Sequence, residues 1–573
     1  MRRKTSASVL TFKLLRLGMI TLFASIVSYI PGWAVFGQAG VALLVPLLLT
    51  LLYRSLYRLV GSGRGQIGYG SRTVRQTQPP APAPSSMAGT APFSGSYSKD
   101  LLAVQTAIGD NSDLHFREFT LANTGARAVL VHIDGMQNDR LLNMQIMQFL
   151  MYDLPEEPLS SAGIARRLLP FSELKEETAI EAFNKYILFG HGGLLIEGLP
   201  CGLLIEVPGA ANRAIAEPVS EALLRGPRLG FSEVLSENTS MLRRQGLSDQ
   251  LEMKSYRAGS TIEREIVIAY MKDIVNPDLL EEIKNRICKI DIDFVAESGY
   301  IEQLIEDNYL SPFQQLQNTE RPDRVISALL EGRVAILLDG TPFVLIAPVT
   351  FSMLLQSPED YYERWLPGTL LRLLRFGASF FALMAPALYI SFISFHPGLI
   401  PTELAITIIK TRQGVPFPSL IEVLILEVSI EILREAGIRL PKPIGPAMGI
   451  VGGLIIGDAA VQAGIVSPFL VITVAVTAIS SFSIPMYSAG ITLRMLRFAG
   501  MLFASVLGMY GTILFFLLIC CHLSKLKSFG VPYLTPLSPF RLSDWKDLFL
   551  RAPMALMKRR PLMMKTRQNK RKS

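Results

Sequence analysis

The chain has 573 residues; half are hydrophobic, 18% are charged, and the formal net charge is +8. This composition is too apolar for a wholly soluble protein and too charged for a pure bundle of membrane helices, so it predicts a mixed architecture. The two ends are strongly basic and lie near apolar runs, which favours the positive-inside rule over nucleic-acid binding.

The first predicted unit, residues 1–60, is a transmembrane hairpin. Residues 9–30 and 35–53 are apolar, and each run is about long enough to cross the hydrocarbon core as a helix. Basic residues flank both outer ends, which places these ends in the cytoplasm. The alternative is a signal peptide followed by one anchor, but no cleavage site of small residues follows the first run. Residues 61–98, rich in Gly, Ser and Pro, are predicted to be a flexible linker.

Two α/β subdomains of related build are predicted next, over residues 99–250 and 251–363. Each contains an apolar strand, a helix, and then two apolar runs around a tight polar turn, which is typical of a hairpin. A charged segment over residues 217–244, expected to be helical, lies between the two copies. The strands and hairpins fall at residues 128–134 and 193–208 in the first copy, and at 265–271 and 334–348 in the second.

Residues 364–525 are predicted to be an all-α helical transmembrane domain, followed by a basic cytosolic tail at residues 526–573. Because both flanks of this domain are basic, both belong in the cytoplasm, and an even number of crossings must separate them. Four apolar runs satisfy this requirement. They cover residues 370–395, 444–466, 469–486 and 496–521, the third being broken near Pro485.

An acidic helix is expected at residues 419–435, within this apolar region. Glu427, Glu431 and Glu435 recur at every fourth residue and form one stripe, whereas Glu422 lies on another flank. Arg434 is one turn from Glu431 and can pair with it. A charged side chain at the bilayer centre costs about 3 kcal/mol, so these carboxylates are expected to face a pore, a wet cavity or a partner.

Two interpretations of the acidic helix stay open at this point. If several copies surround an axis, their glutamates form rings that attract cations into a pore. Alternatively, the helix is interfacial and its carboxylates face water, at about even odds before any family resemblance is considered. The even number of crossings favours a re-entrant or interfacial element, although a full crossing is the other option.

Asp458 is the most isolated acid of the membrane region, next to Gly457. It is either a residue of an ion path or a hydrogen-bonding group between two helices, at comparable odds. The nearby glycines indicate close helix packing. The predicted pore-lining or gating residues are therefore Glu422, Glu427, Glu431 and Asp458.

No catalytic or metal-binding pattern appears in the sequence. The glycine-rich residues 191–193 lack a Walker lysine, and the five histidines are scattered. The four cysteines form no CxxC pair. We therefore expect no enzyme activity and no cofactor.

Several ordered motifs resemble the GerA family of spore germination proteins, the A-type subunits of nutrient germinant receptors. The resemblance covers residues 110–539. Its motifs include residues 320–324 (ERPDR), 339–343 (DGTPF), 357–362 (SPEDYY), 414–418 (GVPFP), 431–437 (EILREAG) and 440–445 (LPKPIG).

The resemblance implies a multi-pass protein of the spore inner membrane, with its soluble domain and C-terminus in the cytoplasm. Family members are thought to form homo-oligomeric rings that release ions during germination. The implied partners are a transporter-like B subunit, a lipoprotein C subunit and membrane lipid, with no nucleic acid. The alternative is a non-conducting membrane scaffold that assembles the other receptor subunits. The N-terminal hairpin is an addition to the usual family pattern.

Overall fold

The computed structural model describes residues 91–122, 124–138, 142–153, 173–206, 217–439, 457–541 and 544–571. The predicted N-terminal hairpin, most of the linker, and most of the predicted span at 444–466 lie outside these ranges. Everything below concerns the described residues.

The first subdomain is built on a five-stranded antiparallel sheet with the order β1-β2-β4-β5-β3. Two helices, α3 and α6, pack on one face, and short π-helical turns at Leu142–Met147 and Phe149–Asp153 cover the other. These turns stand where the sequence predicts a regular helix between the first apolar strand and the hairpin. The bounds are α3 Tyr97–Ile108, β1 Leu114–Thr120, β2 Arg127–Ile133, β3 Glu173–Glu177, α6 Ile180–Leu188, β4 Gly192–Ile196 and β5 Gly202–Glu206.

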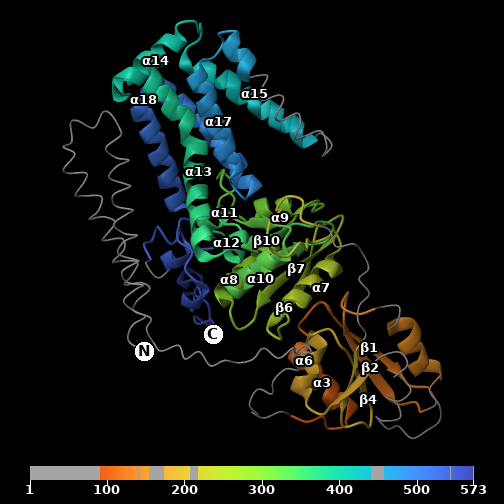
Figure 1. The fold of residues 1–573 in the computed structure, drawn as a ribbon. Helices are drawn as coiled ribbons and strands as arrows, with labels where there is room; N and C mark the ends of the chain where they lie inside the picture. Colours follow the sequence, from red (N-terminus) through yellow and green to blue (C-terminus); the bar gives the residue numbers. More distant parts are fainter. Residues whose placement is uncertain are drawn as a thin grey trace, which may run out of the picture. The chain divides into compact units, whose positions relative to one another are not determined.

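The second subdomain repeats this topology, with the strand order β6-β7-β9-β10-β8 (Figure 1). Each strand has a counterpart at the same place in the first sheet, which agrees with the repeat predicted from the sequence. The bounds are α7 Leu235–Gln245, β6 Leu251–Ala258, β7 Arg264–Met271, α8 Pro277–Ile287, α9 Ser298–Ile305, β8 Gln317–Thr319, α10 Pro322–Leu330, β9 Val334–Leu338, β10 Val344–Ala347, α11 Phe351–Leu354 and α12 Glu359–Tyr362.

Strand β7 shows why this sheet needs a layer on each face. Ile266 and Ile268 belong to the core under α8 and α9, whereas Val267 and Ala269 belong to the core under α7 and α10. Successive side chains of a strand point to opposite faces, so an unbroken apolar run requires two covers.

A buried ion pair joins the two subdomains. Arg243 of α7 donates from Nε to Asp113 Oδ2 at 2.6 Å and from NH2 to Asn111 Oδ1 at 2.9 Å. Both charged side chains are almost fully buried. The segment that precedes α7, residues 217–234, is not helical, so the helix expected over 217–244 was wrong for its first half. Its two prolines and two glycines explain why no helix forms there.

The C-terminal half contains the apolar helices, and α13, α17 and α18 lie side by side (Figure 1). Among the described helices, α13 and α18 are the two that are long and apolar enough to cross a membrane, and α17 is a shorter apolar helix. The bounds are α13 Trp365–Ser394, α14 Thr402–Arg412, α15 Ser419–Arg439, α17 Pro468–Phe482 and α18 Tyr487–Lys525.

Helix α18 is not one straight rod, because the chain reverses at Gly508. This residue has φ 59° and ψ −136°. The rings of Phe503 and Phe515 lie 5.5 Å apart, whereas twelve residues of straight helix would separate them by about 18 Å. The prediction of one span at residues 496–521 was therefore wrong: two antiparallel arms, residues 487–507 and 509–525, meet at a tight turn. The apolar pattern alone does not show a glycine with positive φ.

Helix α15 runs along the bundle. Its first residue, Ser419, hydrogen-bonds Ser394 at the end of α13, and Arg434 near its other end hydrogen-bonds Ser481 at the end of α17. Helix α15 is therefore packed within the bundle, while the expectation of a re-entrant or interfacial element stays a prediction. Arginines of α14 and α18 pair with its buried carboxylates, which lowers the cost of burying them.

The basic C-terminal segment, residues 544–571, packs onto the second subdomain. Met564 enters the core below α8, and Arg567 N donates to Ile274 O at 3.1 Å. Arg560 donates to the carbonyl oxygens of Leu330, Gln568 and Lys570. Short elements mark its course. They are the 3-10 turns Asp544–Asp547, Met554–Leu556 and Leu562–Met564, and the short strands β11 Lys527–Ser528 and β12 Val531–Pro532 precede the segment.

Candidate functional site

Glu422 on α15 is fully buried and paired. Arg412, in the last turn of α14, donates from NH2 to Glu422 Oε1 at 2.5 Å. The sequence places these residues ten positions apart, and the turn between α14 and α15 brings them together. A buried carboxylate with such a partner is held in its charged form at a much lower cost than an isolated one.

Glu427, five residues further along α15, forms an almost completely buried ion pair between two helices. Its Oε2 lies 2.8 Å from Arg497 NH2 on α18, and both side chains are 1% exposed. Removing either partner would leave a buried charge uncompensated, which costs more than the pair contributes while it is intact. The two helices are therefore fixed to each other at this height.

Glu431 is shared by three guanidinium groups. Its carboxylate lies 3.1 Å from Arg497, 3.4 Å from Arg434 and 3.9 Å from Arg494. Arg434 also donates to Ser481 Oγ on α17 at 3.0 Å. We call the five residues Glu427, Glu431, Arg434, Arg494 and Arg497 the charge cluster.

The other acids singled out in the sequence lie elsewhere. Glu435 is exposed and pairs with Arg439 at 2.6 Å. Asp458 is exposed and accepts a hydrogen bond from Gln462 at 2.7 Å. The structure thus brings together Glu427 and Glu431, keeps Glu422 on a separate arginine, and leaves Asp458 apart. Their role in lining or gating a pore stays a prediction.

The arginines of the charge cluster were missed in the sequence, apart from Arg434. Arg494 and Arg497 stand three residues apart inside an apolar run, so they share one helix face. An intramembrane arginine is as unusual as an intramembrane glutamate, and its partner is an acid on a neighbouring helix. Matching acidic and basic positions between helices was the signal that could have found them.

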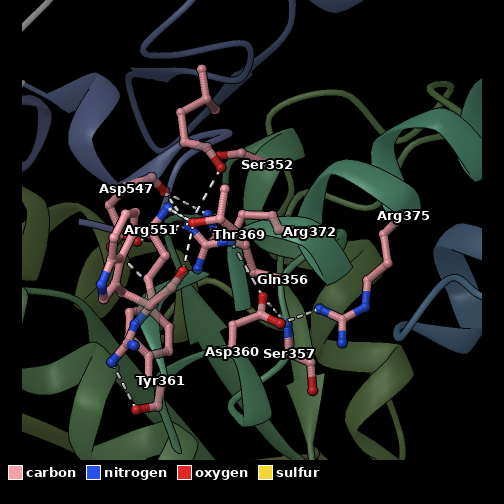
Figure 2. A network of polar contacts seen from close by, with 12 residues as sticks. Ser352, Gln356, Ser357, Asp360, Tyr361, Thr369, Arg372, Arg375, Asp547 and Arg551 are labelled. Carbon is pink, nitrogen blue, oxygen red and sulfur yellow. Dashed lines mark hydrogen bonds and ion pairs between the residues drawn. The ribbon is translucent and has the colours of Figure 1, made fainter. Parts of the chain in front are cut away.

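A second polar network lies where the second subdomain meets α13 (Figure 2). Asp360 of α12 is fully buried, and it accepts from Arg372 at 3.3 Å and from Arg375 at 2.5 Å, both on the first turns of α13. Arg372 also donates to Asp547 Oδ1 at 2.8 Å. One buried guanidinium thus joins α12 and α13 to the distant C-terminal segment.

The C-terminal segment contributes Asp547 and Arg551 to this network. Tyr361 donates to Asp547 Oδ2 at 2.7 Å, and burial together with the Asp547 charge raises the pKa of Tyr361, so this hydroxyl stays protonated. Arg551 donates to the carbonyl oxygens of Glu363 and Tyr361 at 2.8 and 2.9 Å (Figure 2). The network can therefore transmit a displacement of the second subdomain to the first long apolar helix.

A cavity of about 670 Å³ opens beside this network, between α10 and the C-terminal segment. Arg324 and Arg571 line it, but each already pairs with a carboxylate, Glu221 and Glu331 respectively. Among the residues that the structure describes, no group of three or more His, Cys, Asp or Glu side chains could hold a metal ion.

Comparisons with known proteins give one consistent result. The model of the family described as Bacillus/Clostridium GerA spore germination protein matches residues 103–563. Spore germination protein GerLA of Bacillus cereus is 43% identical over 470 residues, which is 81% of this chain and 95% of that protein. The uncharacterized membrane protein YfkQ of Bacillus subtilis (strain 168) is 44% identical over 451 residues, 78% of this chain and 88% of that protein.

Two further matches carry informative names. Spore germination protein A1 of Bacillus subtilis (strain 168) is 40% identical over 459 residues, 80% of this chain and 94% of that protein. Among solved structures, the N-terminal domain of the A subunit of the Bacillus megaterium spore germinant receptor GerK3 is 28% identical, with a TM-score of 0.37. This match covers 46% of this chain and 99% of that one.

Proposed function

The chain belongs to the Bacillus/Clostridium GerA family of spore germination proteins, and we propose that it is a receptor A subunit whose copies form an ion channel. In this proposal the channel opens when nutrient is sensed and releases ions from the spore. The partners are further copies of the chain, a transporter-like B subunit and a lipoprotein C subunit.

The observation that carries the channel proposal is the charge cluster. Five ionisable side chains meet inside a bundle of largely apolar helices. Ionisable groups at membrane depth are rare because they are costly, and they mark ion pathways or moving parts in membrane proteins. A protein that needed only an anchor would not retain them.

Exposed apolar faces support a membrane location for the bundle. Large apolar side chains remain uncovered along α13 and along both arms of α18, and such surfaces mark contacts with lipid or with another copy. They include Leu370, Leu373, Leu374, Phe380 and Phe381 on α13, and Leu502, Val506, Ile513, Leu514, Leu517 and Leu518 on α18.

The basic C-terminal segment supports a cytoplasmic orientation for the soluble part. Because this segment packs onto the second subdomain, both lie on the same side of the membrane. Loops rich in lysine and arginine stay in the cytoplasm. The multi-pass topology therefore has its soluble subdomains and its C-terminus inside the spore.

One observation favours a scaffold as the second candidate function. The glutamates that would line a cation pathway are neutralised by arginines within the same chain. A bundle with its charges paired internally can hold other subunits without conducting.

Ion flux through the purified protein distinguishes the two candidates. We expect liposomes that contain the full chain to release potassium, and Glu427→Gln to change the release rate. Glu435→Gln, an exposed carboxylate on the same helix, is the matched control and should behave as the wild type. A protein that inserts and oligomerises but never conducts, alone or with its partner subunits, would support the scaffold.

A further inference from the structure

The charge cluster contains more positive than negative charge. Three arginines, Arg434, Arg494 and Arg497, face two carboxylates, Glu427 and Glu431. Glu431 is divided among all three guanidinium groups, and Arg494 reaches it only at 3.9 Å, beyond hydrogen-bonding distance. One positive charge is therefore left without an anion of its own.

No described side chain supplies the missing anion. In the described part of the chain, Arg434 Nε and Arg497 Nε are buried and have no hydrogen-bond partner. The sequence that follows α15, residues 440–456, contains neither Asp nor Glu. Since a buried uncompensated charge is expensive, the excess is expected to be balanced from outside the chain.

The cluster lies near the end of the bundle that faces the second subdomain. Arg494 is seven residues from Tyr487, the first residue of α18, which is about 10 Å of helix. Met486, just before it, contacts Arg324 of the second subdomain. Given the proposed membrane location, this height corresponds to the boundary between headgroups and acyl chains of the cytoplasmic leaflet.

The surroundings of the two outer arginines are aromatic and apolar. Arg434 stacks over Phe482 at 4.5 Å, and Arg494 lies 5.7 Å from the ring of Tyr487. Both aromatic side chains are exposed, as is Ile479 one turn before Phe482. Aromatic side chains at this height belong to the interfacial belt, and exposed aliphatic ones suit acyl chains.

The geometry points to a site for the phosphate of an anionic phospholipid headgroup between Arg434 and Arg494, with its acyl chains along α17 and α18. Guanidinium groups bind phosphate oxygens through paired hydrogen bonds. Basic pockets between helices on the cytoplasmic side are established places for such headgroups. This inference rests on the proposed membrane location, but it does not require that the protein conducts ions.

The test is lipid binding by the full-length protein purified in detergent. Native mass spectrometry with added phosphatidylglycerol should show bound lipid, and phosphatidylcholine should bind much more weakly. Arg494→Gln should reduce phosphatidylglycerol binding about tenfold, the value of one charge-assisted hydrogen bond. Arg494→Lys, which keeps the charge but loses the paired hydrogen bonds, should bind phosphatidylglycerol more weakly than the wild type and more tightly than Arg494→Gln. The matched control is Arg439→Gln, which removes an exposed arginine from α15.

Further measurements distinguish two possible sources of the anion, a lipid headgroup and free phosphate. Inorganic phosphate at millimolar concentration should not displace the lipid, and protection from thermal unfolding should require phosphatidylglycerol. The inference is overturned if Arg494→Gln, shown to be folded by an unchanged elution volume, binds phosphatidylglycerol like the wild type. It is also overturned if inorganic phosphate protects equally, or if Arg494→Gln dissociates the oligomer without changing lipid binding. Potassium flux in neutral-lipid liposomes tests the channel separately.

Discussion

The pair formed by Glu427 and Arg497 joins α15 to α18 through two almost fully buried side chains. Glu427→Gln keeps the shape of the side chain but leaves Arg497 with only the shared Glu431. We expect the variant to lose about 2 kcal/mol of stability, because a hydrogen bond between charged groups is lost. Thermal unfolding of the purified protein measures this loss.

A double-mutant cycle tests whether the two residues act as a pair. Glu427→Gln with Arg497→Gln should be less destabilised than the sum of the two single variants, since neither charge is then left alone. Additive effects would show that the residues act independently and would remove the physical basis for assigning Glu427 a role beside Arg497.

Glu302 on α9 is the clearest source of pH dependence in the soluble part. Burial, and to a smaller extent the charge of Glu306, raises the pKa of Glu302 to about 8. The folded protein therefore holds a proton that the unfolded chain releases near its ordinary pKa, so this contribution to stability is lost as pH rises from about 4.5 to 8.

Glu302→Gln should remove this dependence. Relative to the wild type, the variant should gain thermal stability as pH rises through that window and show little difference at pH 4. Glu282→Gln is a suitable control, since Glu282 is a half-exposed carboxylate on neighbouring α8. A constant difference between Glu302→Gln and wild type from pH 4 to 8 would contradict the raised pKa.

Among the helices, α18 depends on the conformation of one residue. A Cβ atom at Gly508 would lie 2.7 Å from the Phe395 ring, and the positive φ is strained for any L residue. We expect Gly508→Ala to destabilise the turn by about 1–2 kcal/mol. Gly437→Ala on α15, where nothing lies within 4 Å, should be neutral or slightly stabilising.

Cysteine cross-linking measures the same turn directly. If α18 is a hairpin, cysteines placed at Phe503 and Phe515 should form a disulfide, because these side chains touch across the two arms. Failure to cross-link in the folded protein would favour the single straight span that the sequence predicts.

How well the sequence predicts the structure differs between these elements. The repeated sheets were predictable, because short apolar runs on either side of a tight turn are local signals. The runs that contain Leu194 and Ile336 are examples. The reversal of α18 was not, because both arms are apolar and Gly508 resembles the packing glycines nearby. The packing of α15 within the bundle was not predictable either. The free-energy cost of burying Glu427 depends on Arg497, which lies seventy residues away in sequence.

The same limit applies to the candidate site. The glutamates of α15 could be found because acids stand out in an apolar run. Whether they are free or paired depends on tertiary contacts, and only the pairing of Glu431 with Arg434 was local enough to predict. The interpretation of the acidic stripe as part of a ring of glutamates depends on contacts between copies of the chain, and it stays a prediction.

Across the whole molecule, the C-terminal segment joins the soluble part to the helical bundle. Arg551 fixes the chain between α12 and α13, and Asp547 binds Arg372 (Figure 2). Arg559, in the same segment, has an exposed side chain. If the segment acted only through its positive charge, replacing either arginine would have the same effect on the contact between the segment and α13. If it acts by packing, only replacement of Arg551 would weaken that contact.

We therefore expect Arg551→Gln to weaken the contact of the C-terminal segment with the chain between α12 and α13. Arg559→Gln should leave this contact unchanged, although both variants remove one positive charge. Loss of two buried charge-assisted hydrogen bonds should lower stability by about 2–4 kcal/mol and expose the start of α13 to protease. Limited proteolysis of the protein in membranes, with cleavage mapped near residue 365, measures this. Equal protection in the two variants would mean that the segment acts as a charged tail. Selective cleavage in Arg551→Gln would mean that the segment holds the start of α13 in place by packing, through the hydrogen bonds of Arg551.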